Sequence, residues 1–130
     1  MILVDSSVWI DFLRGRATPQ SLKLKQLVGE VEIAVGDLIL TEVLQGCLRV
    51  PEFRDTLSVF DQFNIVELGG YDVALQAARN HLYLRSLGYT IRKTIDTIIA
   101  TRCIISSLQL LHSDRDFLPF EKHLGLRTVI

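Results

Sequence analysis

Short runs rich in apolar residues alternate along this chain with longer segments in which apolar residues recur at helical spacing. The short runs, which predict strands, are residues 2–4, 32–35, 64–68, 108–111 and 127–130. The longer segments predict helices over about 7–13, 18–28, 38–48 and 71–87, further helices opening at 51 and 94, and a short helix reaching about 123. Strands that alternate with helices in this way predict an α/β fold with a largely parallel sheet of four to five strands and right-handed crossovers.

Turn and capping residues support these boundaries. Gly15 suits a left-handed helix C-terminus, and Thr18 before Pro19 suits a helix start. Ser6 or Ser7 is expected to cap the first helix, although Asp5 itself is an alternative cap. Thr94 is expected to cap the helix that follows it.

Length and composition predict a single domain over residues 1–130 with a well-buried core, since 48% of the residues are hydrophobic. No apolar run approaches the roughly 20 residues that cross a membrane, and the N-terminus lacks the pattern of a signal peptide. Cys47 and Cys103 fall in predicted helices without metal-ligand spacing, so we expect reduced cysteines in a cytoplasmic protein. A net charge of −1 argues against a strongly basic nucleic-acid binder but not against an enzyme that meets nucleic acid through a metal.

Acidic residues recur where these elements begin or end. Asp5 ends the first apolar run, Asp114 and Asp116 follow a later one, and Asp96 lies in the first turn of a helix. Because the carboxyl ends of parallel strands face one ligand crevice, acids at these points are expected to converge. An acid in a first helical turn is also common for a simpler reason, since it opposes the positive end of the helix.

Glu42 is unusual because it lies among apolar residues of a predicted helix, where an unpaired carboxylate is costly to bury. Gly46 is expected one turn further along the same helix. It would either leave room beside Glu42 or allow close helix packing.

Carboxylates gathered in one place repel one another, and a divalent cation relieves that repulsion. Oxygen ligands without an accompanying cysteine and histidine set favour Mg²⁺ or Mn²⁺ over zinc. The chemistry implied is metal-assisted hydrolysis of a phosphodiester. The spacing of the acids leaves open whether one or two metals bind.

Four blocks of the sequence resemble one family. Residues 3–10, 40–46, 96–100 and 111–117 (LVDSSVWI, LTEVLQG, DTIIA and LHSDRDF) are similar, in order and spacing, to PIN domains of the VapC-type toxins of toxin–antitoxin pairs. The blocks span essentially the whole chain. The resemblance implies a PIN-like, three-layer α/β/α fold.

The resemblance also implies an activity and a site. The activity is that of a Mg²⁺- or Mn²⁺-dependent endoribonuclease that cuts cellular RNA, often tRNA or rRNA, and inhibits translation. By position, the family's four catalytic, metal-binding acids correspond to Asp5, Glu42, Asp96 and Asp114, a less uniform fifth metal ligand to Asp116, and the hydroxyl that supports the first acid to Ser6 or Ser7.

The implied partners are a second copy of the chain and a VapB-like antitoxin. The antitoxin would cover apolar helices and block the acidic site. Its own DNA-binding domain would bring the complex to operator DNA. No membrane partner is implied.

Several other residues have two interpretations. Arg92, Lys93 and Arg115 are candidates for RNA phosphate contacts, against ordinary solvated or charge-balancing cations. His112 would touch substrate or metal, but a histidine with a structural hydrogen bond is the favoured interpretation. Trp9 would stack on a base, but a core or interface position is favoured.

Two other functions are consistent with clustered acids. The first is a receiver-type phospho-acceptor domain, which normally has an acidic pair after its first strand, where this chain has Ser6 and Ser7. The second is a catalytically inert PIN-like binding module, which nothing in the sequence favours because all four acids are present.

Overall fold

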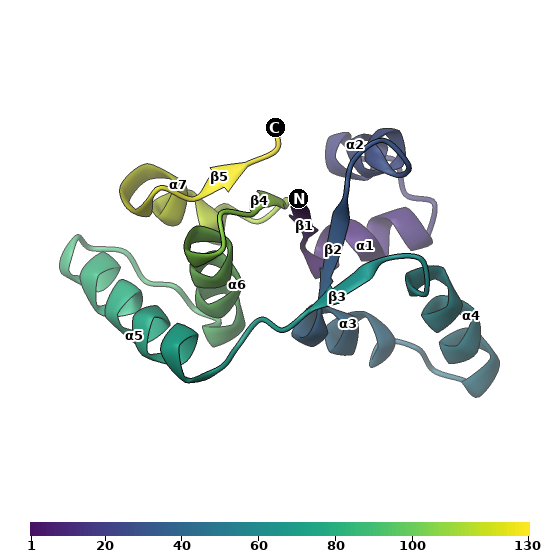
Figure 1. Cartoon of the computed structure of the whole chain (residues 1–130), viewed down its shortest axis with the longest axis horizontal. Coiled ribbons are helices and arrows are strands. Elements are labelled where there is room, and N and C mark those ends of the chain that lie inside the picture. Colours follow the sequence, from purple (N-terminus) through teal and green to yellow (C-terminus); the bar gives the residue numbers. More distant parts are fainter.

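The computed structural model describes all residues, 1–130 (Figure 1). Along the chain, successive strands are separated by one or two helices. The strands are β1 (Ile2–Val4), β2 (Ile33–Gly36), β3 (Asn64–Val66), β4 (Gln109–Leu111) and β5 (Arg127–Thr128). The helices are α1 (Ser6–Leu13), α2 (Pro19–Leu27), α3 (Asp37–Leu44), α4 (Val50–Phe60), α5 (Tyr71–Ser86), α6 (Thr94–Ile105) and α7 (Leu118–Leu124), with a short 3₁₀ helix, η1 (Arg115–Phe117), before α7.

The five strands form one parallel sheet in the order β3-β2-β1-β4-β5. Figure 1 shows α1–α4 on one side of the strands and α5–α7 on the other, so the predicted three-layer α/β/α architecture is confirmed. All three residues of β1, the central strand, are buried. Complete burial of an aliphatic side chain contributes about 1.5–3 kcal/mol, which explains why the most continuous apolar run occupies the middle of the sheet.

The order of the strands creates a switch point between β1 and β4. After β1 the chain passes through α1 and α2 to β2 on one side, whereas after β4 it passes through η1 and α7 to β5 on the other. Connections that leave adjacent strands in opposite directions open a crevice at the carboxyl ends of those strands, where ligands bind in open α/β sheets. The sequence places Asp5 after β1 and Asp114 after β4, so both acids lie at this crevice.

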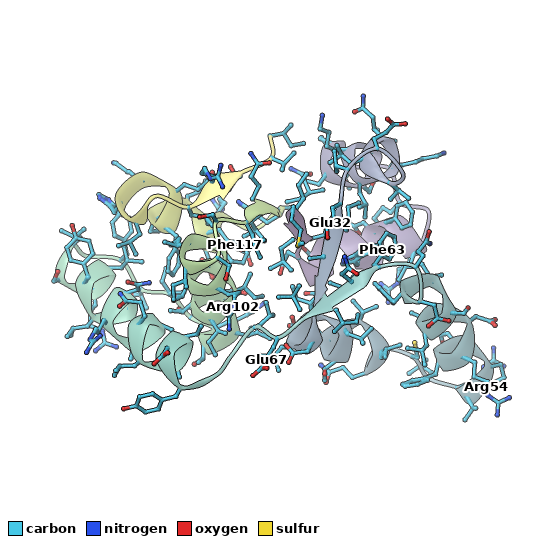
Figure 2. The ribbon with its side chains drawn as sticks, viewed as in Figure 1. Glu32, Arg54, Phe63, Glu67, Arg102 and Phe117 are labelled. Carbon is cyan, nitrogen blue, oxygen red and sulfur yellow. The ribbon has the colours of Figure 1, made fainter.

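An aromatic cluster fills the core beside α1. Trp9 is completely buried, and its ring meets those of Phe12, Phe60 and Phe63 in edge-to-face arrangements with centroid distances of 4.8–5.9 Å. The core interpretation of Trp9 is therefore confirmed. Figure 2 shows Phe63 in this half of the molecule and Phe117 beside α6 in the other half.

Arg102, near the end of α6, holds the segment that crosses between the two halves. Its Nε donates to the carbonyl oxygen of Leu68 (3.2 Å), and its Nη2 donates to that of Gly69 (2.8 Å). These carbonyls belong to the link between β3 and α5, so one guanidinium satisfies two backbone groups that no strand or helix would pair.

Helix α3 is shorter than predicted, and this corrects the interpretation of Gly46. The helix ends at Leu44, and the N–H groups of Gly46 and Cys47 donate to carbonyls three residues back, as in a tightened last turn. Gly46 therefore lies in the turn after the helix, and a Cβ there would approach only the Val43 carbonyl oxygen, at 3.4 Å. It makes no room beside Glu42. Cys47 also lies outside a helix.

The predicted capping residues have mixed outcomes. Thr18 forms a reciprocal capping box with Ser21, and Gly15 has a φ of +68°, both as predicted. For α1 the N-cap position is Asp5, the alternative to Ser6 or Ser7, but its side chain makes no capping hydrogen bond. For α6 the prediction of Thr94 was wrong by one residue, because the N-cap position is Lys93, whose side chain makes no capping hydrogen bond either. The side chain of Asp5 is engaged elsewhere, in the site described below. Cys47 and Cys103 are both free, and no helix has the length and hydropathy of a membrane span.

Gly36, at the end of β2, faces a buried side chain at very short distance. A Cβ at this position would lie 2.5–2.9 Å from three side-chain atoms of Leu68, which is completely buried and whose N–H donates to Asp37 Oδ1 (3.0 Å). We expect Gly36→Ala to lower the free energy of unfolding by about 1–3 kcal/mol through overpacking. Urea denaturation measures the change. The control is Gly69→Ala, where a Cβ meets nothing within 4 Å, and equal stability of the two variants would contradict the prediction.

Candidate active site

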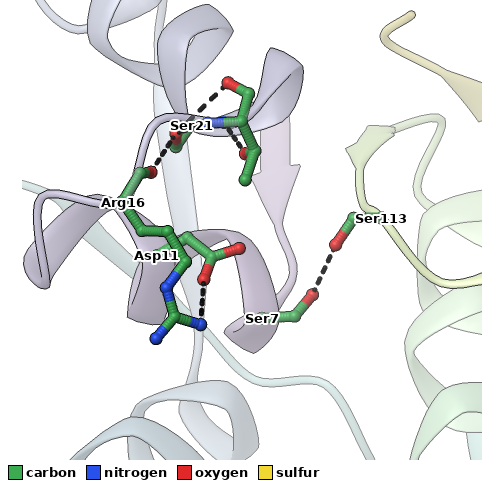
Figure 3. A network of polar contacts seen from close by, with 6 residues as sticks. Ser7, Asp11, Arg16, Ser21 and Ser113 are labelled. Carbon is green, nitrogen blue, oxygen red and sulfur yellow. Dashed lines mark hydrogen bonds and ion pairs between the residues drawn. The ribbon is translucent and has the colours of Figure 1, made fainter.

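Asp5 is fixed by both its backbone and its side chain. Its N–H donates to the carbonyl oxygen of Leu111 (3.0 Å), which continues the β1–β4 ladder by one residue. Its Oδ2 accepts a hydrogen bond from Ser7 Oγ (3.0 Å). Ser7 Oγ in turn lies 3.2 Å from Ser113 Oγ (Figure 3). Because the single Ser7 proton goes to the carboxylate, Ser113 is the donor to Ser7. A chain of two hydroxyls thus orients Asp5, which is only 5% exposed.

Asp114 and Asp116 are oriented by the backbone of the segment after β4. Asp114 is the N-cap of η1, and its Oδ1 accepts from the N–H of Asp116 (2.9 Å). The N–H of Asp114 donates in turn to Nδ1 of His112 (3.2 Å). Both acids are half-buried. The sharp turn therefore presents two carboxylates within three residues.

His112 supports this turn. Since its Nδ1 accepts a hydrogen bond, the proton of the neutral ring is assigned to Nε2, which lies 3.6 Å from Glu121 Oε2 on α7. The other oxygen of Glu121 accepts from Thr128 Oγ1 (2.6 Å) in β5. His112 is buried, and its ring packs at a tilt of 51° against that of Phe117, so the structural interpretation is confirmed.

Asp96 completes a cluster of three acids. It lies in the first turn of α6 and is 5% exposed. One carboxylate oxygen each from Asp96, Asp114 and Asp116 lie within 4.8 Å of one another. Asp96 Oδ2 is buried without any hydrogen-bond partner. Residues from α6 and from the end of β4 thus converge, as the positions of the acids in the sequence predict.

Asp5 and Glu42 border this cluster without belonging to it. Beside the larger effect of burial, the charge of Asp5 raises the pKa of both Glu42 and Asp96, so Asp5 acts on the same region. Glu42 is half-buried on α3, and the Ser6 hydroxyl and Lys93 both lower its pKa. The Ser7 hydroxyl and the Ser6 backbone N–H therefore support Asp5, whereas the Ser6 hydroxyl acts on Glu42.

Burial is the main cause of the unusual electrostatics. Removal from water raises the pKa of Asp5, Glu42 and Asp96, because it disfavours the charged form of a carboxyl group. For Asp96, burial and the neighbouring charges of Asp5 and Asp114 together raise the pKa to about 7, against an ordinary value of 3.8. Without a cation, this carboxyl group therefore takes up a proton at a much higher pH than an ordinary aspartic acid does.

These features fit a divalent cation. Asp96 has a buried oxygen without a hydrogen-bond partner, and the carboxylates of Asp114 and Asp116 lie close to this residue. A positive charge at this point would pair with that oxygen and relieve the repulsion among the three carboxylates. The donors are oxygens only, which suits Mg²⁺ or Mn²⁺.

Cations line the open side of the site. Arg92 Nε lies 3.8 Å from Asp116 Oδ2, and Lys93 lowers the pKa of Asp96. An open hollow of about 530 Å³, here called the acid-site hollow, contains no hydrophobic residue. It is lined by Ser7, Arg92, Ser113, Asp114, Arg115 and Asp116. All three cations proposed from the sequence thus lie at or beside the acids.

Ser113 is a site residue that sequence reasoning missed. Its partner Ser7 is 106 residues away, so no local pattern marks the contact. Its place directly before Asp114, in the segment after β4, is the only signal that the sequence carries.

Comparisons with known proteins agree with this geometry. The family model of the PIN domain matches residues 2–122. Ribonuclease VapC11 of Mycobacterium tuberculosis is 27% identical over 128 residues, which cover 90% of this chain and 89% of the relative. Two solved structures share the fold. VapBC2 from Rickettsia felis, bound to a DNA fragment from its promoter, has a TM-score of 0.77 at 16% identity and covers 99% of this chain and 98% of its own. A toxin–antitoxin complex from Klebsiella pneumoniae has a TM-score of 0.71 at 20% identity and covers 100% and 97%.

The raised pKa of Asp96 predicts how the stability of the metal-free protein depends on pH. Between the ordinary value of 3.8 and about 7, the folded state binds more protons than the unfolded state, so its stability falls as the pH rises through this window. Asp96→Asn removes the part of this dependence that belongs to Asp96, whereas Asp5 and Glu42, whose pKa values are also raised, keep theirs. The substitution is expected to raise the free energy of unfolding near pH 8 by up to about 4 kcal/mol.

Urea denaturation in EDTA across this pH range measures the effect. The matched control is Asp55→Asn, which changes an exposed carboxylate on α4. A wild-type stability that rises toward neutral pH, with no gain in Asp96→Asn near pH 8, would show that folding does not raise the pKa of Asp96.

Proposed function

Since this chain belongs to the PIN domain family, we propose that it is a metal-dependent endoribonuclease of the VapC type, which hydrolyses phosphodiester bonds in RNA. The observation that carries this proposal is the cluster of Asp96, Asp114 and Asp116 at the switch point of the sheet, with a buried, unpartnered oxygen on Asp96. The name of the relative VapC11 supports RNA as the substrate.

Mg²⁺ or Mn²⁺ would be held by Asp96, Asp114 and Asp116, with Asp5 and Glu42 adding negative charge beside it. When bound, the cation supplies Lewis acidity, which lowers the pKa of an attacking water and stabilises negative charge that develops on the phosphate.

The other residues prepare the site for this reaction. Ser7 and Ser113 hold the Asp5 carboxylate in one orientation, so it needs no rearrangement when substrate arrives. Asp5, Glu42, Asp96 and Asp114 are the proposed catalytic acids. Arg92, Lys93 and Arg115 at the open side would bind phosphates of the RNA, which positions the chain without reading its sequence. Arg92 already lies opposite an acid, so phosphate binding would exchange one anion for another.

We further propose a VapB-like antitoxin as the partner that blocks this site, with operator DNA bound only through the antitoxin. Its support is the likeness of the fold to toxin–antitoxin complexes, one of them bound to promoter DNA. A homodimer, a cytoplasmic location, tRNA or rRNA as the target and inhibition of translation complete the proposal, and these rest on the resemblance to VapC-type toxins. The family assignment leaves the receiver-type alternative without support.

Cleavage of a total-RNA preparation by purified, antitoxin-free protein tests the activity. We expect discrete fragments with Mg²⁺ or Mn²⁺ and none with EDTA. Asp5→Asn and Asp96→Asn are expected to lower the rate by about 10²–10³-fold or more, since each removes a negative charge that would help to hold the cation at the reacting phosphate. Asp55→Asn should cleave like the wild type. Undiminished cleavage by Asp5→Asn would contradict the assignment of the site.

Calorimetric titration with Mg²⁺ and Mn²⁺ separates the nuclease from the inert module. Binding is expected in the wild type, and Asp114→Asn should weaken it by at least about tenfold, because a ligand charge is lost from the site. Wild-type protein that binds neither ion would favour the inert alternative. Growth arrest on expression, lost in Asp96→Asn, would then decide whether the RNA target was simply missing from the cleavage assay.

A further inference from the structure

A second hollow adjoins the acids. It has a volume of about 320 Å³ and lies between the segment before α6 and the start of α7. Its lining includes Tyr89, Ile91, Leu118, Pro119 and Lys122, and we call it the α7 hollow. Arg115 and Asp116 line both this hollow and the acid-site hollow, so the two open next to each other across η1.

The two hollows differ in the chemistry of their walls. The acid-site hollow has no hydrophobic residue. Its polar and charged side chains can bind a phosphate, but they give a nucleobase no apolar surface to pack against. The α7 hollow combines the apolar side chains of Ile91, Leu118 and Pro119 with the ring of Tyr89. Leu118 is 51% exposed, so its side chain is not needed to complete the core.

The aromatic wall is already held in place. A hydrogen bond of 3.0 Å joins the Tyr89 hydroxyl to Nε2 of His123 on α7, and the two ring centroids lie 5.3 Å apart. A ring that is fixed before binding loses little conformational freedom when a base packs against it. Bases of any sequence pack on such surfaces, because each has an apolar π face.

Unpaired positive charge lies on the same rim. Arg115 and Lys122 are both exposed, and neither side chain forms a hydrogen bond or an ion pair within the chain. The three features next to one another match three parts of one strand of nucleic acid. The apolar and aromatic wall suits a base, the two free cations suit a phosphate, and the proposed hydrolytic acid cluster suits the scissile bond.

We propose that the α7 hollow binds the nucleotide next to the scissile phosphate of single-stranded RNA, an inference that rests on the proposed nuclease function. The base packs against Tyr89 and Leu118. Lys122 binds the phosphate on the side of this nucleotide that lies away from the scissile bond. Cleavage then requires an unpaired nucleotide beside the cut, because a base within a duplex is stacked and cannot enter the hollow.

Steady-state cleavage and equilibrium binding of a short, fluorescein-labelled single-stranded RNA of mixed sequence test this subsite. The variants are Leu118→Ser and Lys122→Ala, both at exposed positions on α7. The matched controls, Leu22→Ser and Lys25→Ala, lie on α2, where Leu22 is 57% exposed. Binding is followed by fluorescence anisotropy in EDTA, and cleavage is measured with Mg²⁺ or Mn²⁺.

We expect each α7 variant to raise Kd and KM by about 3–10-fold with kcat little changed, and the double variant by at least about tenfold. Lys122→Ala should also make the slope of log K against log salt concentration shallower by about 0.7, the value for one phosphate contact on a single strand. Tyr89→Leu should weaken binding by about 5–100-fold through lost stacking. The α2 variants should match the wild type.

The outcomes separate this inference from the function on which it rests. Wild-type cleavage that the α7 variants leave unchanged would overturn the subsite and leave the nuclease intact. Equal weakening by the α2 controls would also overturn it, since the effect would then be one of general charge or surface. Failure of the wild type to bind or cleave any RNA would overturn the proposed function, and the subsite with it.

Discussion

The parallel pairing of β1 with β4 is the interaction on which the sheet and the site both depend. β1 belongs to the half of the chain that ends at β3, and β4 belongs to the half that begins with α5, so this pair joins them. The N–H of Asp5 extends the ladder to Leu111 by one further hydrogen bond. That bond fixes the position of Asp5 along the strand direction relative to the turn that carries Asp114 and Asp116. A shift of one residue in this register would turn Asp5 to the other face of the sheet.

The scaffold holds the acids in an arrangement that their own charges oppose. Burial and mutual repulsion both raise the pKa of Asp96, and Asp5 and Glu42 are affected in the same direction. The opposing forces are individually small: a serine hydroxyl on Asp5, a backbone N–H on Asp114 and the nearby charge of Lys93. Rigid elements supply the remainder, because the acids follow buried strands or lie in a first helical turn and have little freedom to separate.

The fold and the acid positions were predictable because they depend on local signals. Apolar runs and helical spacing predicted the strand and helix order, and the position of Asp5 directly after β1 predicted its place at the crevice. Contacts that depend on distant segments were not predictable. The Ser7–Ser113 pair and the walls of the α7 hollow join residues that no local pattern links. The length of α3 was also missed, since its apolar pattern continues past Leu44 although its hydrogen bonds tighten there.

The buried acids also shape how such a protein changes over generations. Most substitutions in a core destabilise the fold. Replacing one of these acids by an uncharged residue instead removes charge repulsion together with the catalytic function of that acid. A lineage under pressure to lose a harmful nuclease therefore has a short route to an inactive chain that still folds. Such a chain would keep every surface outside the site and so would still compete for the partners of its active relatives. We therefore expect a protein whose site is built from buried like charges to have inactive but well-folded descendants.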